Sequence, residues 1–73
     1  MFSMDLVSAG QFKVSELIDG DLISIDGEVV TIISIADDPT GDIFFIKHEN
    51  DFGEIEIAEY RYHDSVELFV FSE

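Results

Sequence analysis

The clearest pattern along the chain is a pair of β-branched runs joined by a two-residue polar turn. In residues 21–25 and 28–35, Ile, Val and Thr recur with the period of two that a β-strand gives to its two faces. Asp26-Gly27 separates the runs, and both residue types tolerate the positive φ that a type I′ turn requires. The pattern therefore predicts a β-hairpin over residues 21–35, around which the rest of the chain is organised.

The residues after the hairpin show the same period, interrupted by residues typical of turns. Turns are expected at residues 37–41, 49–53 and 63–65. Strands are expected at residues 42–47, 54–58 and 66–71. In 54–58 Glu and Ile alternate strictly, so we expect the isoleucines to face the core and the glutamates to face solvent.

The segment before the hairpin is less regular. The alternation of Phe2, Met4 and Leu6 stops at Ser8-Ala9-Gly10, so residues 1–10 are expected to form a loosely ordered N-terminal strand or arm. Residues 11–14 fit a short strand, and 15–20 fit a turn. Together these elements predict one small all-β domain over residues 1–73. Its strands are expected to form an antiparallel meander of four to five strands, either a twisted sheet or a small SH3-like barrel.

The start of the hairpin also carries a resemblance to a known class of fold. Val14, Leu17 and Gly20-Asp21 precede a strand, the Asp26-Gly27 turn and a second strand. This arrangement resembles the opening of small SH3-like barrels of the translation-factor KOW type, over about residues 12–35. The resemblance implies binding to RNA or to a basic, nucleic-acid-contacting surface, and the scarcity of Lys and Arg argues against RNA.

Several of the expected strands are apolar on both faces. A single sheet in a monomer has one buried side, and no helical segment is expected that could cover the other side. We therefore expect a two-fold homodimer, and the alternative is a tightly curled barrel with a few exposed apolar side chains. The residues expected to form the core and the dimer interface are Val30, Ile32, Phe44, Phe45, Phe69 and Phe71.

The chain is much more acidic than most small domains. Seventeen Asp and Glu stand against three Lys and Arg, for a net charge of −14. Direct nucleic-acid binding is excluded as an expectation, because phosphate contacts need basic side chains. No apolar run reaches the roughly 20 residues of a membrane span, and the N-terminus lacks a signal-peptide pattern, so a cytoplasmic protein without a membrane partner is expected.

No motif identifies a reaction. His48 and His63 are the only histidines, and each is expected at a strand end or in a turn. Asp37, Asp38 and Asp42 do not match a calcium-binding loop, and the chain has no cysteine. We therefore expect no catalytic residue, no metal site and no cofactor.

The acids themselves are the remaining candidate for a functional surface. In size, acidity and lack of catalytic motifs the chain is similar to phage-encoded DNA-mimic inhibitors, small acidic β-rich proteins that occupy the DNA-binding surfaces of host proteins. That resemblance implies a basic target, such as an HU-type nucleoid protein, a nuclease or RNA polymerase, in the cytoplasm of a bacterial host. The acids expected to contact such a target are Asp19, Asp21, Asp26, Glu28, Glu49, Asp51, Glu54, Glu56 and Glu59.

A second hypothesis comes from a different functional class. The chain would be an SH3-like interaction module that binds through an apolar groove, with its acidity serving only solubility. Phe52, Tyr60, Tyr62 and Phe69 would then line an exposed patch. Neutralising acids would abolish binding under the first hypothesis and would change little under the second.

Overall fold

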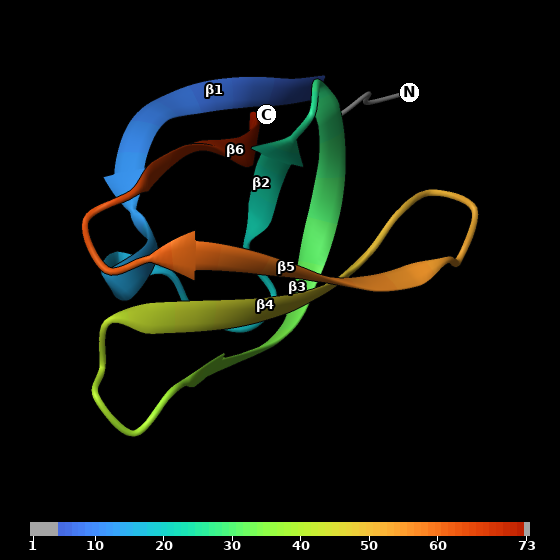
Figure 1. Ribbon diagram of the computed structural model, residues 1–73. Coiled ribbons are helices and arrows are strands. Elements are labelled where there is room, and N and C mark those ends of the chain that lie inside the picture. Colours follow the sequence, from blue (N-terminus) through green and yellow to red (C-terminus); the bar gives the residue numbers. More distant parts are fainter. Residues whose placement is uncertain (1–4, 73) are drawn as a thin grey trace.

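The computed structural model describes residues 5–72, and its strands form a single sheet (Figure 1). The strands are β1 (Asp5–Lys13), β2 (Leu22–Ile25), β3 (Glu28–Asp37), β4 (Ile43–Glu49), β5 (Ile55–Arg61) and β6 (Ser65–Ser72). A short 3-10 helix, η1 (Val14–Glu16), follows β1. The strand order is β1-β6-β2-β3-β4-β5 and every pair is antiparallel, which confirms the all-β prediction.

The strand order differs from the expected meander at one place. Strands β2 to β5 follow one another as predicted, but β6 lies between β1 and β2, and the described residues form six strands where four to five were expected. The strand expected at 11–14 is longer than predicted, because β1 continues through the predicted break at Ser8-Ala9-Gly10. A bulge between Ser8 and Gly10 absorbs the irregularity, and Gly10 supplies the positive φ of 101°. Of the predicted N-terminal arm, residues 5–10 therefore belong to β1, and residues 1–4 lie outside the described part.

The central hairpin forms as the sequence predicts. Asp26 and Gly27 have φ angles of 52° and 81°, and Ile25 pairs with Glu28 across the turn. The other end of β2 is joined to β3 by a hydrogen bond from the Ile32 N–H to the Asp21 carbonyl, at 2.8 Å. The β2–β3 hairpin is thus closed by the turn at one end and by a backbone hydrogen bond at the other.

The core lies on one face of this curled sheet. Its buried side chains are Val14, Leu17, Ile23, Val30, Ile32, Ile46 and Val66. Figure 1 shows β3 bending between one half of the sheet, which contains β1, β6 and β2, and the other half, which contains β4 and β5. Strands β1 and β5 are the two edges, so the described strands form an open sheet in which the concave face holds the core.

The six apolar residues predicted for the core and dimer interface divide between the two faces. Val30 and Ile32 are buried, and Phe44 packs against the core. Phe69 is half-buried, whereas Phe45 and Phe71 are exposed. Phe45 is next to the buried Ile46, and Phe69 is next to Leu68, which packs against the core, so alternation places both Phe side chains on the convex face.

The prediction for the alternating segment 54–58 was wrong in its orientation. Ile46 is buried on the concave face and pairs with Ala58, so the even-numbered residues of β5 face inward. Ile55 and Ile57 therefore point outward and are 53% and 67% exposed. Glu56 pairs with the buried His48 and lies on the concave side. The alternation was correctly recognised, but the register with β4 decides which half of it meets the core.

Candidate functional site

Four carboxylates line a small cavity where the β2–β3 turn approaches the start of β5. The cavity has a volume of about 90 Å³ and is lined by Ile25, Asp26, Glu28, Val30, His48, Asn50, Glu54 and Glu56. Asp26 and Glu28 come from the hairpin, and Glu54 and Glu56 come from a segment more than twenty residues later. The curl of the sheet is what brings these two pairs of acids together.

The charge of the hairpin turn affects a side chain of β5 (Ile55–Arg61). Tyr60 lies on the same face of this strand as Glu56, because the two are separated by an even number of residues. Partial burial raises the pKa of the Tyr60 phenol, and the negative charges of Asp26 and Asp64 raise it further. A carboxylate placed near the phenol disfavours its ionised form. On the concave side of β5, Glu56 is the carboxylate of the strand itself, and Asp26 and Asp64 lie close enough to Tyr60 to act on its phenol.

The turn that precedes β5 holds Glu54 in position. The Asn50 side-chain oxygen accepts hydrogen bonds from the backbone N–H groups of Phe52 and Glu54, both at 2.9 Å. The Asn50 amide donates to Glu54 Oε1 at 3.0 Å, and the Asn50 N–H donates to the Glu54 carbonyl at 3.0 Å. Gly53, with a φ of 79°, permits the tight return of the chain. Glu54 is thus oriented by its own turn.

His48 forms part of the cavity wall and was missed as a site residue. Its side chain is only 6% exposed, and its Nδ1 atom has no hydrogen-bond partner among the described residues. His48 is the penultimate residue of β4 and His63 lies in a turn, as expected, but the expectation did not include the inward position of the His48 side chain. The signal in the sequence was the alternation of Phe44, Ile46 and His48, which places all three side chains on one face.

Four of the nine predicted acids converge at this cavity: Asp26, Glu28, Glu54 and Glu56. Asp19 and Asp21 do not join them, because they precede β2 whereas Asp26 follows it. The Asp21 side chain instead accepts a hydrogen bond from the Ile18 N–H at 2.9 Å. Glu49, Asp51 and Glu59 also lie outside the cavity lining. The four residues of β2 separate Asp19 and Asp21 from Asp26.

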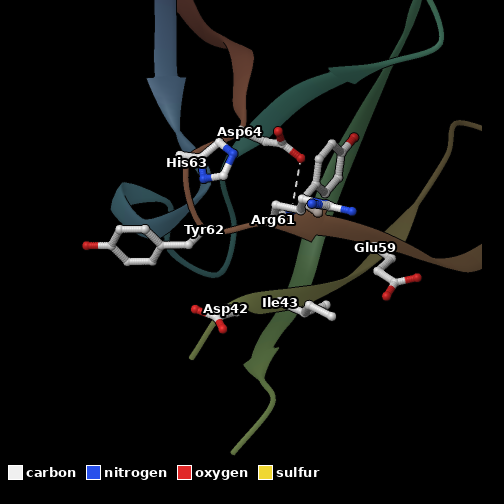
Figure 2. Close-up of a pocket in the computed structure, with 8 residues that line it drawn as sticks. Asp42, Ile43, Glu59, Arg61, Tyr62, His63 and Asp64 are labelled. Carbon is white, nitrogen blue, oxygen red and sulfur yellow. Dashed lines mark hydrogen bonds between the residues drawn. The ribbon is translucent and has the colours of Figure 1, made fainter. Parts of the chain in front are cut away.

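A second, larger depression lies at the other end of β5. Its volume is about 690 Å³, and it is lined by Asp42, Ile43, Glu59, Tyr60, Arg61, Tyr62, His63 and Asp64. The Tyr62 ring stacks on Phe44 with a centroid separation of 6.1 Å. Figure 2 shows Tyr62 and Glu59 at opposite ends of this depression, with the backbone N–H of Arg61 donating to Asp64 at 2.8 Å. Two of the four aromatic residues in the second hypothesis, Tyr60 and Tyr62, therefore share one surface.

Each depression is lined by one histidine together with several carboxylates, His48 in the smaller one and His63 in the larger one. Among residues 5–72, no three His, Cys, Asp or Glu side chains are grouped in a way that could hold a metal ion. The Asp38 carboxylate closes the β3–β4 turn, where hydrogen bonds from the Thr40 hydroxyl and from backbone N–H groups lower its pKa. No helix in the described part of the chain has the length and apolar character that a membrane crossing requires.

What this arrangement can do is attract and hold positive charge. Carboxylates from two segments line one cavity, and on the neighbouring part of the convex face Ile55 and Ile57 are exposed. Comparison with protein-family models, with curated proteins and with solved structures finds no match to this chain, so its function is argued from this geometry.

Proposed function

We propose that this protein is an acidic DNA mimic, which binds a basic nucleic-acid-binding protein and blocks its access to DNA. The observation that supports the proposal is the convergence of Asp26, Glu28, Glu54 and Glu56 around one cavity on a chain of net charge −14. Repulsion among such carboxylates destabilises the folded chain, and a cationic partner relieves it. In this proposal the target is a nucleoid protein, a nuclease or RNA polymerase in a bacterial cytoplasm.

Geometry supports the comparison with a row of phosphates. Glu54 comes directly before β5 and Glu56 lies in it, so a rise of about 3.4 Å per residue in extended backbone puts their Cα atoms about 7 Å apart. Asp26 and Glu28, at the hairpin turn, add a second row across the cavity. A DNA duplex presents one charge per roughly 1.7 Å of axis, distributed over two strands. Two short rows of carboxylates therefore imitate a short stretch of backbone.

A displacement assay tests the proposal. A fluorescent DNA duplex bound to an HU-type nucleoid protein is titrated with this protein at low salt, and the anisotropy of the DNA is followed. We expect displacement that weakens strongly as salt rises, because the Debye length falls from about 10 Å at 0.1 M to about 3 Å at 1 M. Failure to displace DNA from any of several basic DNA-binding proteins at low salt would contradict the proposal.

Matched charge variants separate a local surface from net charge. Glu54→Gln with Glu56→Gln removes two charges from the cavity and retains the Glu54 side-chain acceptor. Glu16→Gln with Asp37→Asn removes two exposed charges that neither line the cavity nor belong to the nine predicted acids. Both variants carry −12, obtained from −14 by removing two acids. We expect about a tenfold loss of affinity for the first and less than about threefold for the second, because only the first removes contacts.

The aromatic depression supports a second candidate function. Tyr60, Tyr62 and Arg61 line it together, and aromatic residues and Arg are enriched in protein interfaces. Under this candidate the chain is an SH3-like interaction module. Tyr62→Ala would then abolish partner binding, whereas the Glu54 and Glu56 variant would bind normally.

We also propose that two copies associate through the convex face. The exposed side chains there include Phe45 and Phe71, at 38% and 54% exposure, and Leu6, which pairs with Phe71. Association would remove these side chains from water, at roughly 25 cal/mol per Å² of apolar surface. Sedimentation equilibrium of the wild type and of Phe71→Ser tests this: a monomeric wild type at high micromolar concentration would refute it.

A further inference from the structure

The outer edge of β5 leaves a row of backbone groups without a strand to pair with. β5 is the last strand in the sheet order, so only one of its sides meets β4. In an antiparallel pair, alternate residues direct their N–H and C=O groups toward the partner strand, and the others direct them away. An unpaired edge of this kind is a ready template for another extended chain.

Hydrogen bonds at the end of β5 show which residues face outward. The Tyr62 N–H donates to the Asp42 carbonyl at 2.9 Å, so the even-numbered residues point toward β4. The backbone groups of Arg61 point away from β4, because its N–H donates to Asp64 Oδ2 and its carbonyl accepts from the Asp64 N–H. Alternation then directs the N–H and C=O groups of Ile55, Ile57 and Glu59 to the free side.

Pro, Lys and bulges, three of the usual protections of an edge strand, are missing along this stretch, whereas the inward-pointing charge of Glu56 is present and disfavours any added strand without a basic side chain beside it. Edge strands are commonly protected by Pro, by Lys or by a bulge. Residues 55–59 contain neither Pro nor Lys, and their register with β4 is continuous. The two isoleucines beside the free amides are 53% and 67% exposed, so an added strand would also cover apolar surface. Both the backbone and the side chains favour an additional strand.

The two faces of β5 determine what pattern the added strand must have. On the convex face, Ile55 and Ile57 would lie beside its side chains, which favours apolar residues there. On the concave face, Glu54 and Glu56 would lie beside the intervening side chains, with Asp26 and Glu28 nearby, which favours Lys or Arg. At this edge a second copy would bring its own Glu54 and Glu56 beside the same carboxylates, so pairing between two β5 strands is disfavoured.

We propose that β5 accepts an extended segment of the basic partner as an added antiparallel strand, in which apolar residues alternate with Lys or Arg. The inference rests on the proposed function for the basic character of the partner, and it adds the mode of binding. The added strand would pair with Ile55, Ile57 and Glu59. Its basic side chains would enter the ring of carboxylates around the cavity.

A synthetic peptide and amide hydrogen exchange test this mode directly. The probe is a short peptide in which Lys and Val alternate, and its control has the same composition with all Lys residues before all Val residues. We expect the Ile57 and Glu59 amides to exchange rapidly in the free protein and to become protected at least tenfold when the alternating peptide binds. The Ala58 amide, which is directed toward β4, should be protected throughout.

Two variants at one position separate the backbone contribution from the side chain. Ile57→Pro removes an N–H that faces away from β4, at an edge position where proline is tolerated. Ile57→Thr keeps the N–H and the β-branched shape. We expect the proline variant to bind the alternating peptide about tenfold more weakly, equivalent to about 1.4 kcal/mol, and the threonine variant to remain within about threefold. The exchange measurement on the wild type does not depend on how well either variant folds.

The outcomes distinguish failure of this inference from failure of the proposed function. If both peptides bind equally and the edge amides stay unprotected, the acids attract positive charge without strand addition, and this inference alone is overturned. If the edge amides are already protected in the peptide-free protein, and more so at higher concentration, β5 pairs with a second copy and the inference is likewise overturned. If neither peptide binds, even at low salt, the proposed function fails as well.

Discussion

Replacing Ile46 and Ile57 separately by alanine gives the sharpest test of the fold. Both are isoleucines in neighbouring strands of one sheet, only one residue apart in the pairing, since Ile46 is opposite Ala58 and Lys47 is opposite Ile57. Their environments differ completely, because Ile46 is 0% exposed and Ile57 is 67% exposed. An alternating pattern interpreted without register would place both isoleucines in the core.

The expected magnitudes follow from burial. Removing a fully buried isoleucine side chain costs about 2–5 kcal/mol, because transfer free energy is lost and a cavity remains. Full burial of such a side chain is worth about 1.5–3 kcal/mol, so Ile57, with about a third of its surface covered, should lose roughly 0.5–1 kcal/mol. A domain of this length is stable by about 4–11 kcal/mol, at 0.05–0.15 kcal/mol per residue. Ile46→Ala should therefore remove a large part of the stability and Ile57→Ala a small part.

Urea unfolding followed by far-ultraviolet circular dichroism measures both values. The midpoint for Ile46→Ala should fall far below that of the wild type, and the midpoint for Ile57→Ala should move slightly, with the slope unchanged in both. The scans are repeated at two protein concentrations. Concentration independence for Ile57→Ala shows that its side chain is solvated in the state that unfolds.

Equal destabilisation by the two substitutions would refute the assigned register. If the Ile57 effect is large and independent of concentration, β5 has its isoleucines in the core and its glutamates outside. If that effect is large and grows with concentration, a second copy covers the convex face of β5. A large effect that does not depend on concentration would mean that neither the acidic cavity nor the free edge of β5 is assigned correctly. A large effect that grows with concentration would mean that only the free edge is assigned wrongly.

Three further predictions follow from individual groups. His48→Leu should raise the free energy of unfolding by about 1 kcal/mol, because the buried Nδ1 has no partner to lose; a loss of stability would show that the imidazole is bonded in solution. Asp26→Asn should lower the pKa of Tyr60 toward its ordinary value of 10.0, measured by phenolate absorbance in a variant lacking the other tyrosine; an unchanged titration would mean that the hairpin turn is distant from β5. The folded state holds the Tyr60 proton more tightly than the unfolded state does. The free energy of unfolding should therefore decline as the pH rises above 10.0 and through the raised pKa of Tyr60. Tyr60→Phe should remove that decline. Thr40→Ala should raise the pKa of Asp38, measured by carboxyl NMR, because it removes the shortest hydrogen bond to that carboxylate. The stability that Asp38 provides is present above pH 3.8 and is lost as the pH falls through its lowered pKa.

Local chemistry in the sequence was sufficient for much of the fold. The Asp26-Gly27 turn, the period-two strands and the turn near Pro39 follow from φ preferences and side-chain alternation, which act over a few residues. These signals predicted the all-β class and the boundaries of the later strands to within a few residues. Composition likewise gave the charge and directed attention to the acids as a functional surface.

Tertiary structure alone decided how these elements meet. The position of β6 between β1 and β2 depends on pairing between residues far apart in the chain, such as Ile23 with Leu68. The orientation of β5 depends on its register with β4, and a shift of one residue would exchange Glu56 with Ile57 between the faces. The same register makes the hairpin acids and the β5 acids neighbours. Alternation specifies that a strand has two different faces, but only the packing of that strand on its neighbours specifies which face is buried.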